Sequence, residues 1–214
     1  MMDDTDFVHL LISFSLQVGL SWALASIIGQ LIQPCGYSDD IVGQALLITS
    51  VAGTFGSFFL AYLLRSNHEK YFFVYKVLIV LTSTGCLLCF AVNRPNQDVF
   101  ILLCWMFYGF TAGPLTPVTL ELAAEMTYPI PADNSAALLF TVAIGVYFVC
   151  TVALTPLLRS STSMSCSSII TPASASVCAV TALASLIAIP LKPLFKRREM
   201  AAKEHANRNM ATRL

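Results

Sequence analysis

Six long apolar runs constrain this chain more than any other feature of its sequence. Each is about 20 residues or longer, the length that an α-helix needs to cross the apolar core of a bilayer. Within lipid, backbone groups must be paired internally, and a helix achieves this within one segment. The runs cover residues 7–33, 41–64, 71–92, 98–122, 134–158 and 172–191. We therefore predict an all-α integral membrane protein with six transmembrane helices.

Composition supports this class and excludes another. Hydrophobic residues make up 57% of the 214-residue chain and charged residues only 11%, which is far more apolar than a typical soluble domain. The formal net charge is zero, so no basic field favours nucleic acid, and no nucleic-acid recognition motif is present. The first run follows three aspartates rather than basic residues and is too long for a signal-peptide core, so we expect it to remain as a spanning helix.

The distribution of lysine and arginine predicts the orientation. Ten of these residues fall on one side of the predicted membrane, against Arg94 and Arg159 on the other. The ten are Arg65, Lys70, Lys76, Lys192, Lys196, Arg197, Arg198, Lys203, Arg208 and Arg213. By the positive-inside rule both termini are cytoplasmic. We divide the chain into a transmembrane domain, residues 1–195, and a basic tail, residues 196–214, which either binds anionic lipid or only anchors the topology.

Most of the seven cysteines are interpreted as small apolar residues, because five of them fall inside the apolar runs. The pair Cys86-x-x-Cys89 is a weak metal or redox signal, since no second cysteine pair or histidine lies near it in sequence. Cys35 and Cys166 fall in links expected on the outer side, where conditions permit a disulfide between them. The sequence predicts no metal site and no cofactor.

Residues 109–131 are the most specific part of the chain. Pro114 and Pro117 each remove a backbone donor and clash with the preceding turn, so the fourth helix is expected to bend there. Glu121 and Glu125 are four residues apart, which puts both carboxylates on one helical face beyond the bend. Small residues four apart, as in Ala52/Gly56, Gly53/Ser57 and Gly109/Gly113, are expected to let neighbouring helices approach closely.

This stretch resembles the signature of the feline leukaemia virus subgroup C receptor family, FLVCR, within the major facilitator superfamily. The resemblance rests on the run Pro117-Val-Thr-Leu-Glu121-Leu-Ala-Ala-Glu125-Met-Thr127-Tyr128-Pro129, followed by Ser135-Ala-Ala-Leu-Leu139. It is densest over residues 109–139 and weaker from about residue 19 to 191. The resemblance implies six helices equivalent to the C-terminal half of a twelve-helix transporter, built as two pseudo-symmetric three-helix units.

The depth of the two glutamates favours an inner-gate role. Glu121 lies 23 residues after Asp98, or roughly 35 Å along a helix, which places it at the cytoplasmic edge. We hypothesise that Glu121 and Glu125 form a polar latch to the basic link at Arg65 and Lys70 when the transporter faces outward. The alternative is a carboxylate pair that only ends the helix. The superfamily marker at this link is partly kept, because Arg65 is present and the preceding aspartate is not.

Candidate pathway residues follow from depth and from the resemblance. Trp22 lies near the middle of the first run, where FLVCR relatives carry a tyrosine that faces the translocation cavity. An indole ring suits a quaternary ammonium group through cation–π attraction, worth up to about 2 kcal/mol when desolvated. Relatives place a glutamine at the position of Ile144, so that polar partner is absent here. The substrate-pathway candidates are Trp22, Gln30, Pro117 and Ile144. Trp105 and Tyr108 are assigned to interface anchoring or packing.

The resemblance implies a transporter that moves a small organic solute, such as choline, ethanolamine or haem, by alternating access. Because the pathway of this superfamily runs between two halves, the chain is expected to act as a fragment or half-unit that needs an N-terminal half or a second copy. The alternative is a non-transporting six-helix membrane protein that acts as a regulatory or assembly partner. No catalytic motif is present, so we do not expect an enzyme. The sequence leaves the plasma membrane and organelle membranes equally open.

Overall fold

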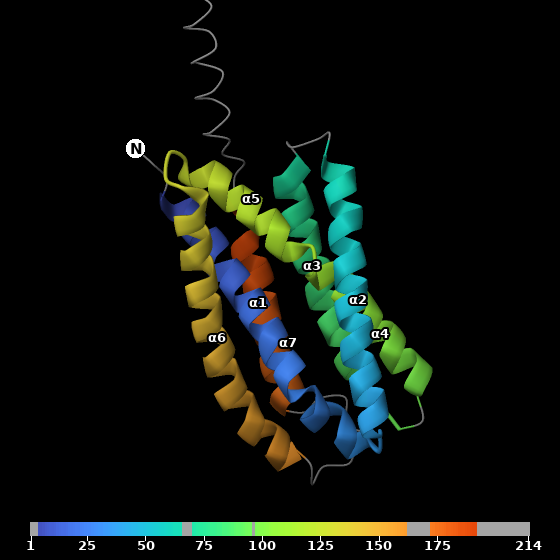
Figure 1. Ribbon diagram of the computed structural model, residues 1–214. Helices are drawn as coiled ribbons and strands as arrows, with labels where there is room; N and C mark the ends of the chain where they lie inside the picture. Colours follow the sequence, from blue (N-terminus) through green and yellow to red (C-terminus); the bar gives the residue numbers. More distant parts are fainter. Residues whose placement is uncertain (1–3, 66–69, 96, 162–171, 192–214) are drawn as a thin grey trace, which may run out of the picture.

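The computed structural model describes residues 4–65, 70–95, 97–161 and 172–191. Within these ranges the chain forms α-helices and one short 3-10 turn, and no strand occurs there (Figure 1). The elements are α1 (Asp4–Ile32), η1 (Gln33–Cys35), α2 (Asp39–Leu64), α3 (Tyr71–Ala91), α4 (Asp98–Ala112), α5 (Leu115–Thr127), α6 (Ala132–Ser161) and α7 (Pro172–Ala188). The predicted all-α fold is confirmed. The predicted tail, residues 196–214, lies outside the described residues, so the domain boundary stays a prediction.

Among the residues that the structure describes, five helical segments are long and apolar enough to cross a membrane. They are Thr5–Cys35, Asp39–Leu64, Tyr71–Ala91, Asp98–Thr127 and Ala132–Leu158. The sixth predicted span, residues 172–191, contains only a shorter apolar helix, Ser174–Ala188. A six-span topology is therefore not confirmed, and the sixth span stays a prediction.

The helices pack in a pattern that repeats along the chain. The principal partner of α1 is α6, and the principal partner of α2 is α4. In addition, α7 packs on α1 and α3 packs on α4, while α3 and α7 lie against each other. If α1, α2 and α3 are matched with α4, α6 and α7, the α1–α6 contact maps onto α2–α4, the α1–α7 contact maps onto α3–α4, and the α3–α7 contact maps onto itself. This is the arrangement expected of two pseudo-symmetric units.

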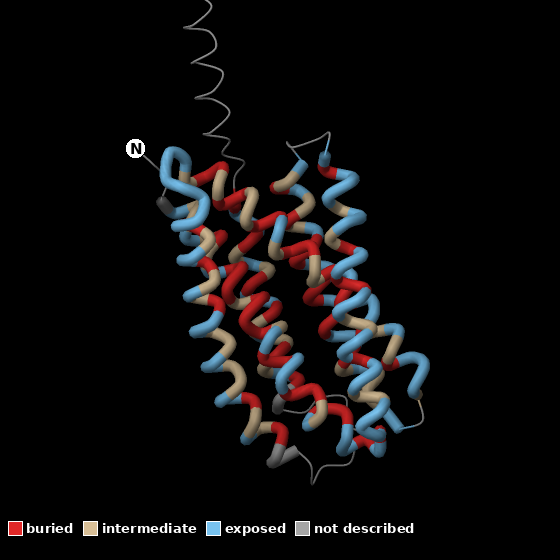
Figure 2. The backbone as a smooth tube through the Cα atoms, viewed as in Figure 1, coloured by how far each residue is buried: buried red, intermediate tan, exposed pale blue. Residues whose placement is uncertain are grey.

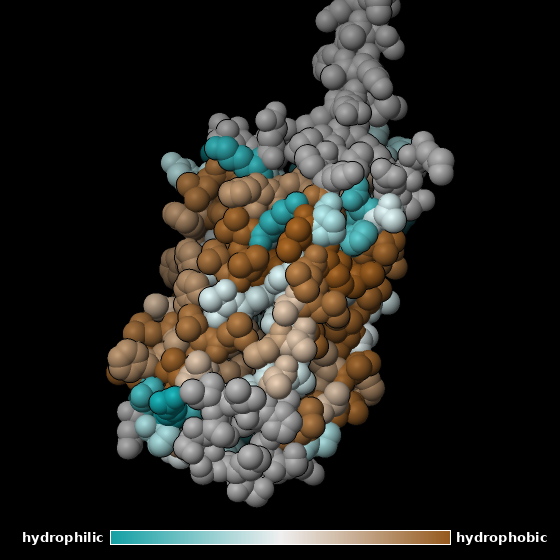
Figure 3. All heavy atoms as spheres, turned by 180° about the vertical axis from the view of Figure 1, so that it is seen from behind, coloured by the Kyte–Doolittle hydropathy of each residue, from teal (hydrophilic) through white to brown (hydrophobic). Residues whose placement is uncertain are grey.

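Two helices, α2 and α6, bury little of their surface within the chain. Only 17% of an apolar 18-residue window of each helix is buried, and Figure 2 shows both as mainly exposed. Their outward side chains are large and apolar, as with Phe58 at 72% exposed and Phe148 at 66%. On the face drawn in Figure 3, hydrophobic residues cover most of the surface between the two ends, with residues of intermediate hydropathy among them, and the most hydrophilic residues lie mainly toward the ends. Such faces need lipid or a second protein surface to cover them.

Glycines bring α2 and α4 into backbone contact. A Cβ atom added at Gly109 would lie 2.2 Å from the Thr49 carbonyl oxygen, and one at Gly113 would lie 2.3 Å from the Gly53 carbonyl oxygen. The matching pair, α1 and α6, uses Gly19, where an added Cβ would lie 2.7 Å from the Ala143 carbonyl oxygen. The predicted role of Gly53, Gly109 and Gly113 in close helix approach is confirmed.

The predicted bend in the fourth span is a break between α4 and α5. α4 ends at Ala112, and α5 begins at Leu115, directly after Pro114. Pro117 sits in the first turn of α5, where a backbone N–H has no helical partner, so its missing donor costs nothing. Figure 1 shows that α5 turns away from the direction of α4 and leans toward α6, against which it packs.

The end of the bundle where α1 ends and α2 begins is held by polar contacts. Asn93 Nδ2 donates to the Leu31 carbonyl at 2.8 Å, and the Tyr37 hydroxyl donates to the Arg94 carbonyl. Burial raises the pKa of Tyr37 above its ordinary value, so the phenol stays a donor at neutral pH. Cys35 is disulfide-bonded, while Cys166, its predicted partner, lies outside the described residues.

Candidate functional site

A cavity of about 380 Å³ lies between α1, α2 and the break that separates α4 from α5. It is at mid-depth, because Trp22 lies near the middle of the first span and Gly53 near the middle of the second. This volume falls in the range of small-molecule sites. Its polar and aromatic lining residues are Gln17, Ser21, Trp22, Thr49, Ser50, Thr54, Ser57, Thr82, Trp105, Tyr108 and Thr116.

The hydroxyl groups that line the cavity mainly present hydrogen-bond acceptors to its interior. Five of them donate to a carbonyl four residues earlier in their own helix, at 2.7–3.0 Å. These are Ser21, Thr49, Ser50, Thr54 and Ser57. Because the proton of each is already used, lone pairs on the oxygen remain to accept a hydrogen bond. Each of these hydroxyl protons is therefore bonded to the backbone of its own helix without any ligand, while the hydroxyl oxygens still make the cavity wall polar.

Three aromatic side chains share this wall. The Trp22 ring stacks on Phe140 of α6 at a centroid distance of 6.2 Å and remains 37% exposed. Trp105 and Tyr108 pack edge to face at 5.7 Å, and the Tyr108 hydroxyl donates to Ser21 Oγ at 2.7 Å. Among the described residues that line the cavity, none carries a charge. Aromatic rings and oxygen lone pairs together suit an electron-poor or weakly hydrated cationic group better than an anion.

Of the four predicted pathway residues, the structure brings one to the cavity. Trp22 lines it. Gln30 is exposed near the C-terminal end of α1, Pro117 is exposed in the first turn of α5, and Ile144 is 54% exposed on α6. These three do not line the cavity, and their contact with a substrate stays a prediction.

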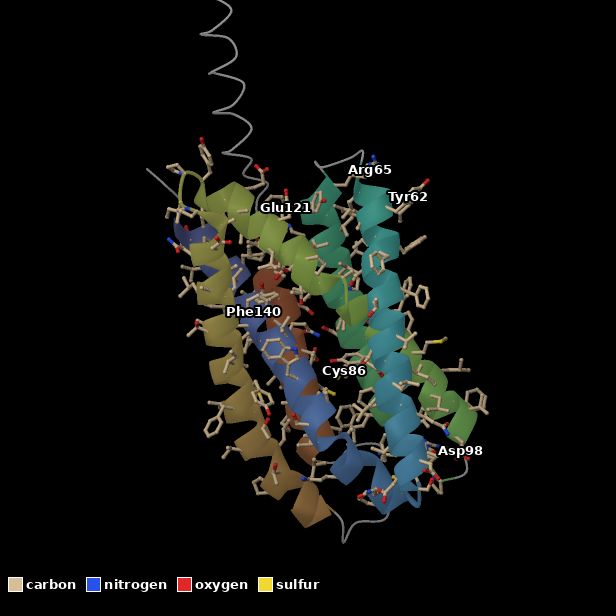
Figure 4. All side chains as sticks on the ribbon, in the orientation of Figure 1. Tyr62, Arg65, Cys86, Asp98, Glu121 and Phe140 are labelled. Carbon is tan, nitrogen blue, oxygen red and sulfur yellow. The ribbon has the colours of Figure 1, made fainter. Side chains whose placement is uncertain are left out.

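The predicted gate residues lie at one end of the bundle. Figure 4 shows Glu121 on α5 and Arg65 on α2 toward the end opposite Asp98, in agreement with the predicted depth of Glu121. Glu121 is partly buried, and Glu125 is buried at 7% exposed. Within the part of the chain that the structure describes, no ion pair joins either glutamate to Arg65. The latch was predicted for the outward-facing state, so it stays a prediction.

Sequence reasoning missed most of the cavity. Gln17 and Thr82 were not predicted as site residues, because only ionisable residues within the apolar runs were taken as functional candidates. Trp105 and Tyr108 were assigned to packing, and they do pack, but they also line the cavity. An uncharged amide such as Gln17 in the middle of an apolar run was the signal that could have found the site.

Two features of the described part of the chain define its class. It has five apolar helices long enough to span a membrane, and a polar cavity lies at mid-depth between them. No family model matches the chain. It is 30% identical over 133 residues to solute carrier family 49 member A3 of Danio rerio, a match that covers 62% of this chain and 28% of that protein. An uncharacterised MFS-type transporter of Caenorhabditis elegans is 27% identical over 141 residues, covering 65% of this chain and 24% of the relative.

A third relative is the choline/ethanolamine transporter FLVCR1 of Mus musculus, 26% identical over 145 residues, or 66% of this chain and 26% of that protein. The relatives of the chain are thus transporters of the major facilitator type, and the resemblance to the FLVCR family is confirmed. Together with the apolar helices, they identify a multi-pass integral membrane protein. The chain spans about a quarter of the length of the relatives that it matches.

Proposed function

We propose that this chain is part of a transporter that carries a small organic solute across a membrane by alternating access. The observation that supports this most is the uncharged, polar and aromatic cavity at mid-depth, bounded by α1, α2, α3 and the α4–α5 break. A binding site near the bilayer midplane, next to a broken helix, is typical of secondary transporters. Under this proposal the exposed faces of α2 and α6 pack against an N-terminal half or a second copy.

A choline-like amine is the first substrate candidate. Its quaternary ammonium group carries a diffuse, weakly hydrated charge, which suits the rings of Trp22, Trp105 and Tyr108. The back-bonded hydroxyls of the wall supply further oxygen lone pairs. The name of one relative includes choline and ethanolamine as its substrates. Haem is the second candidate, but its two carboxylates would meet no cationic side chain in the described lining of the cavity.

Uptake by the complete native protein in proteoliposomes tests this function. Radiolabelled choline, ethanolamine and haem are offered separately, and protein-free liposomes measure leakage. We expect saturable choline uptake that unlabelled choline abolishes and an excess of haem does not. Saturable uptake of none of the three would contradict this substrate class and favour the alternative, a non-transporting membrane partner of another protein.

We also propose that both termini are cytoplasmic and that Glu121 and Glu125 meet Arg65 when the inner gate closes. Glu125→Arg and Arg65→Glu should each slow uptake about two- to fivefold, the size expected for an ion pair worth up to about 1 kcal/mol. The double reversal should recover most of the loss, because it restores opposite charges. Uptake rates corrected for the amount of folded protein measure this.

The matched control is Arg94→Glu, because Arg94 is exposed and lies in the link between α3 and α4. It should not rescue Glu125→Arg. Losses that simply add in the Glu125→Arg, Arg65→Glu double variant would contradict the latch and leave the two carboxylates as an end to the helix.

A further inference from the structure

Three buried polar atoms in the wall of the cavity have no hydrogen-bond partner within the described part of the chain. They are Gln17 Oε1, Thr82 Oγ1 and Trp105 Nε1. The side chains that carry them are 2%, 0% and 3% exposed. A buried donor or acceptor without a partner is costly, more so in lipid than in water, and is rarely retained without a use. All three come from different helices and meet at this one cavity.

Two hydroxyl groups of the wall next to these atoms, on Ser21 and Thr49, are hydrogen-bonded, unlike the three atoms themselves. Ser21 Oγ donates to the Gln17 carbonyl at 2.8 Å. Thr49 Oγ1 donates to the Ala45 carbonyl at 2.7 Å and shares this one proton with the Trp105 carbonyl at the longer distance of 3.2 Å. The carbonyl groups of Gln17 and Trp105 thus contact hydroxyls of the wall, while Gln17 Oε1 and Trp105 Nε1 have no partner among the described residues. Ser15 Oγ is also buried without a partner among the described residues, but Ser15 does not line the cavity, whereas Gln17, Thr82 and Trp105 all do.

The chemistry of the three atoms defines what can satisfy them. Gln17 Oε1 only accepts a hydrogen bond, the Trp105 indole N–H only donates one, and the Thr82 hydroxyl can do either. A carboxylate would satisfy Trp105 and repel Gln17, whereas an ammonium group would satisfy Gln17 and repel the indole N–H. A hydroxyl group both donates and accepts, so a single one can satisfy Gln17 and Trp105 together.

We propose that Gln17, Trp105 and Thr82 bind a hydroxyl group of the transported solute and so select hydroxylated solutes over analogues that lack the hydroxyl. The proposal rests on the transport function proposed above and goes further, because it names the part of the solute that is read. The three atoms are covered by their neighbours in this structure. Entry of the solute therefore requires side-chain rotation, which the three torsions of Gln17 and the single torsion of Thr82 allow.

The test compares choline with propyltrimethylammonium, in which a methyl group replaces the hydroxyl. Inhibition constants for labelled choline uptake are measured with the complete native protein. The wild type should prefer choline by about tenfold or more, since the analogue leaves buried polar groups unpaired. In Gln17→Leu and Trp105→Phe the ratio should fall toward one, chiefly because choline binds less well. Thr82→Val should lower it in the same direction.

Thr84→Val is the matched control for Thr82→Val. Thr84 is exposed on the same helix, and its hydroxyl donates to the Val80 carbonyl at 2.9 Å. It should keep the wild-type ratio. A wild-type ratio near one, or a ratio unchanged in Gln17→Leu and Trp105→Phe, would overturn the proposal even if choline is transported.

A second readout separates this proposal from the proposed function. The thermal stabilisation of the purified protein is measured with two matched pairs, choline with propyltrimethylammonium and ethanolamine with propylamine. Stabilisation by the hydroxylated member alone, lost in Gln17→Leu, would support hydroxyl recognition even where choline uptake fails. Absence of a hydroxyl preference in both pairs would overturn it, whatever the transport result.

Discussion

Replacing Gly109 by alanine is expected to prevent α2 from packing closely on α4. The new methyl group would lie 2.2 Å from the Thr49 carbonyl oxygen and 2.7 Å from the Thr49 Cα atom. Both are backbone atoms, so no side-chain rotation relieves the clash and the helices must move apart. Overpacking of this kind costs about 3 kcal/mol where the backbone has to shift. The free energy of unfolding in detergent micelles, together with the folded yield, measures the loss.

Two other glycines serve as graded controls. An alanine at Gly145 on α6 meets nothing within 4 Å, and one at Gly53 on α2 comes only to 3.2 Å from the nearest atom. Gly145→Ala should be neutral or slightly stabilising, because alanine favours helix more than glycine does. Gly53→Ala should fall between it and Gly109→Ala. Equal stability of the Gly145 and Gly109 variants would show that close contact between α2 and α4 contributes nothing to the fold.

Trp22→Ala is expected to lower the apparent affinity for choline by about 30-fold. Loss of a desolvated cation–π contact worth about 2 kcal/mol corresponds to this factor. Trp22 is the predicted pathway residue that lines the cavity, and its side chain remains partly exposed there. Trp22→Phe should lose less, because an aromatic face remains. The KM for choline uptake measures the change, with the amount of folded protein held equal.

Phe140→Ala separates a role in binding from a role in packing. Phe140 stacks on Trp22 from α6, yet it does not line the cavity; Figure 4 shows it between α6 and α1. If Trp22 contacts the solute, Phe140→Ala should raise the KM much less than Trp22→Ala does. Equal effects of the two variants would mean that the Trp22–Phe140 stack contributes only to the packing of α1 against α6. Trp22 would then no longer be assigned to solute binding.

The fold was largely predictable because lipid leaves a chain few choices. Apolar runs longer than 20 residues had to form helices, and their predicted bounds agree with the first five spans to within a few residues, except that the fourth continues to Thr127. Pro114 marked the break, since proline cannot donate to the preceding turn. The partner of each helix could not be read in the same way. Nothing in the residues themselves says that Gly19 meets Ala143 rather than a helix nearer in sequence.

The candidate site was predictable only in part, and for a physical reason. Charge in a membrane is conspicuous, so Glu121 and Arg65 drew attention from sequence alone. Neutral polar groups are common in apolar helices, where hydroxyls bond to their own backbone, as Ser50 and Thr54 do. Gln17 is recognisable in the sequence as an amide within an apolar run, but Thr82 differs from these hydroxyls only in having no such partner among the described residues. That difference depends on the three-dimensional surroundings, so a sequence does not reveal it.

The pairing of α1 with α6 has a consequence for how the protein is made. Ala132, where α6 begins, comes 100 residues after Ile32, where α1 ends. At a synthesis rate of about 5–20 residues per second, α1 waits roughly 5–20 s in the membrane before its main partner exists. α2 likewise makes few contacts with its neighbours α1 and α3 and must wait for α4. During this interval the glycine faces of α1 and α2 can pack against non-native partners. The rate of synthesis and membrane insertion therefore determines how long these two helices must avoid such contacts.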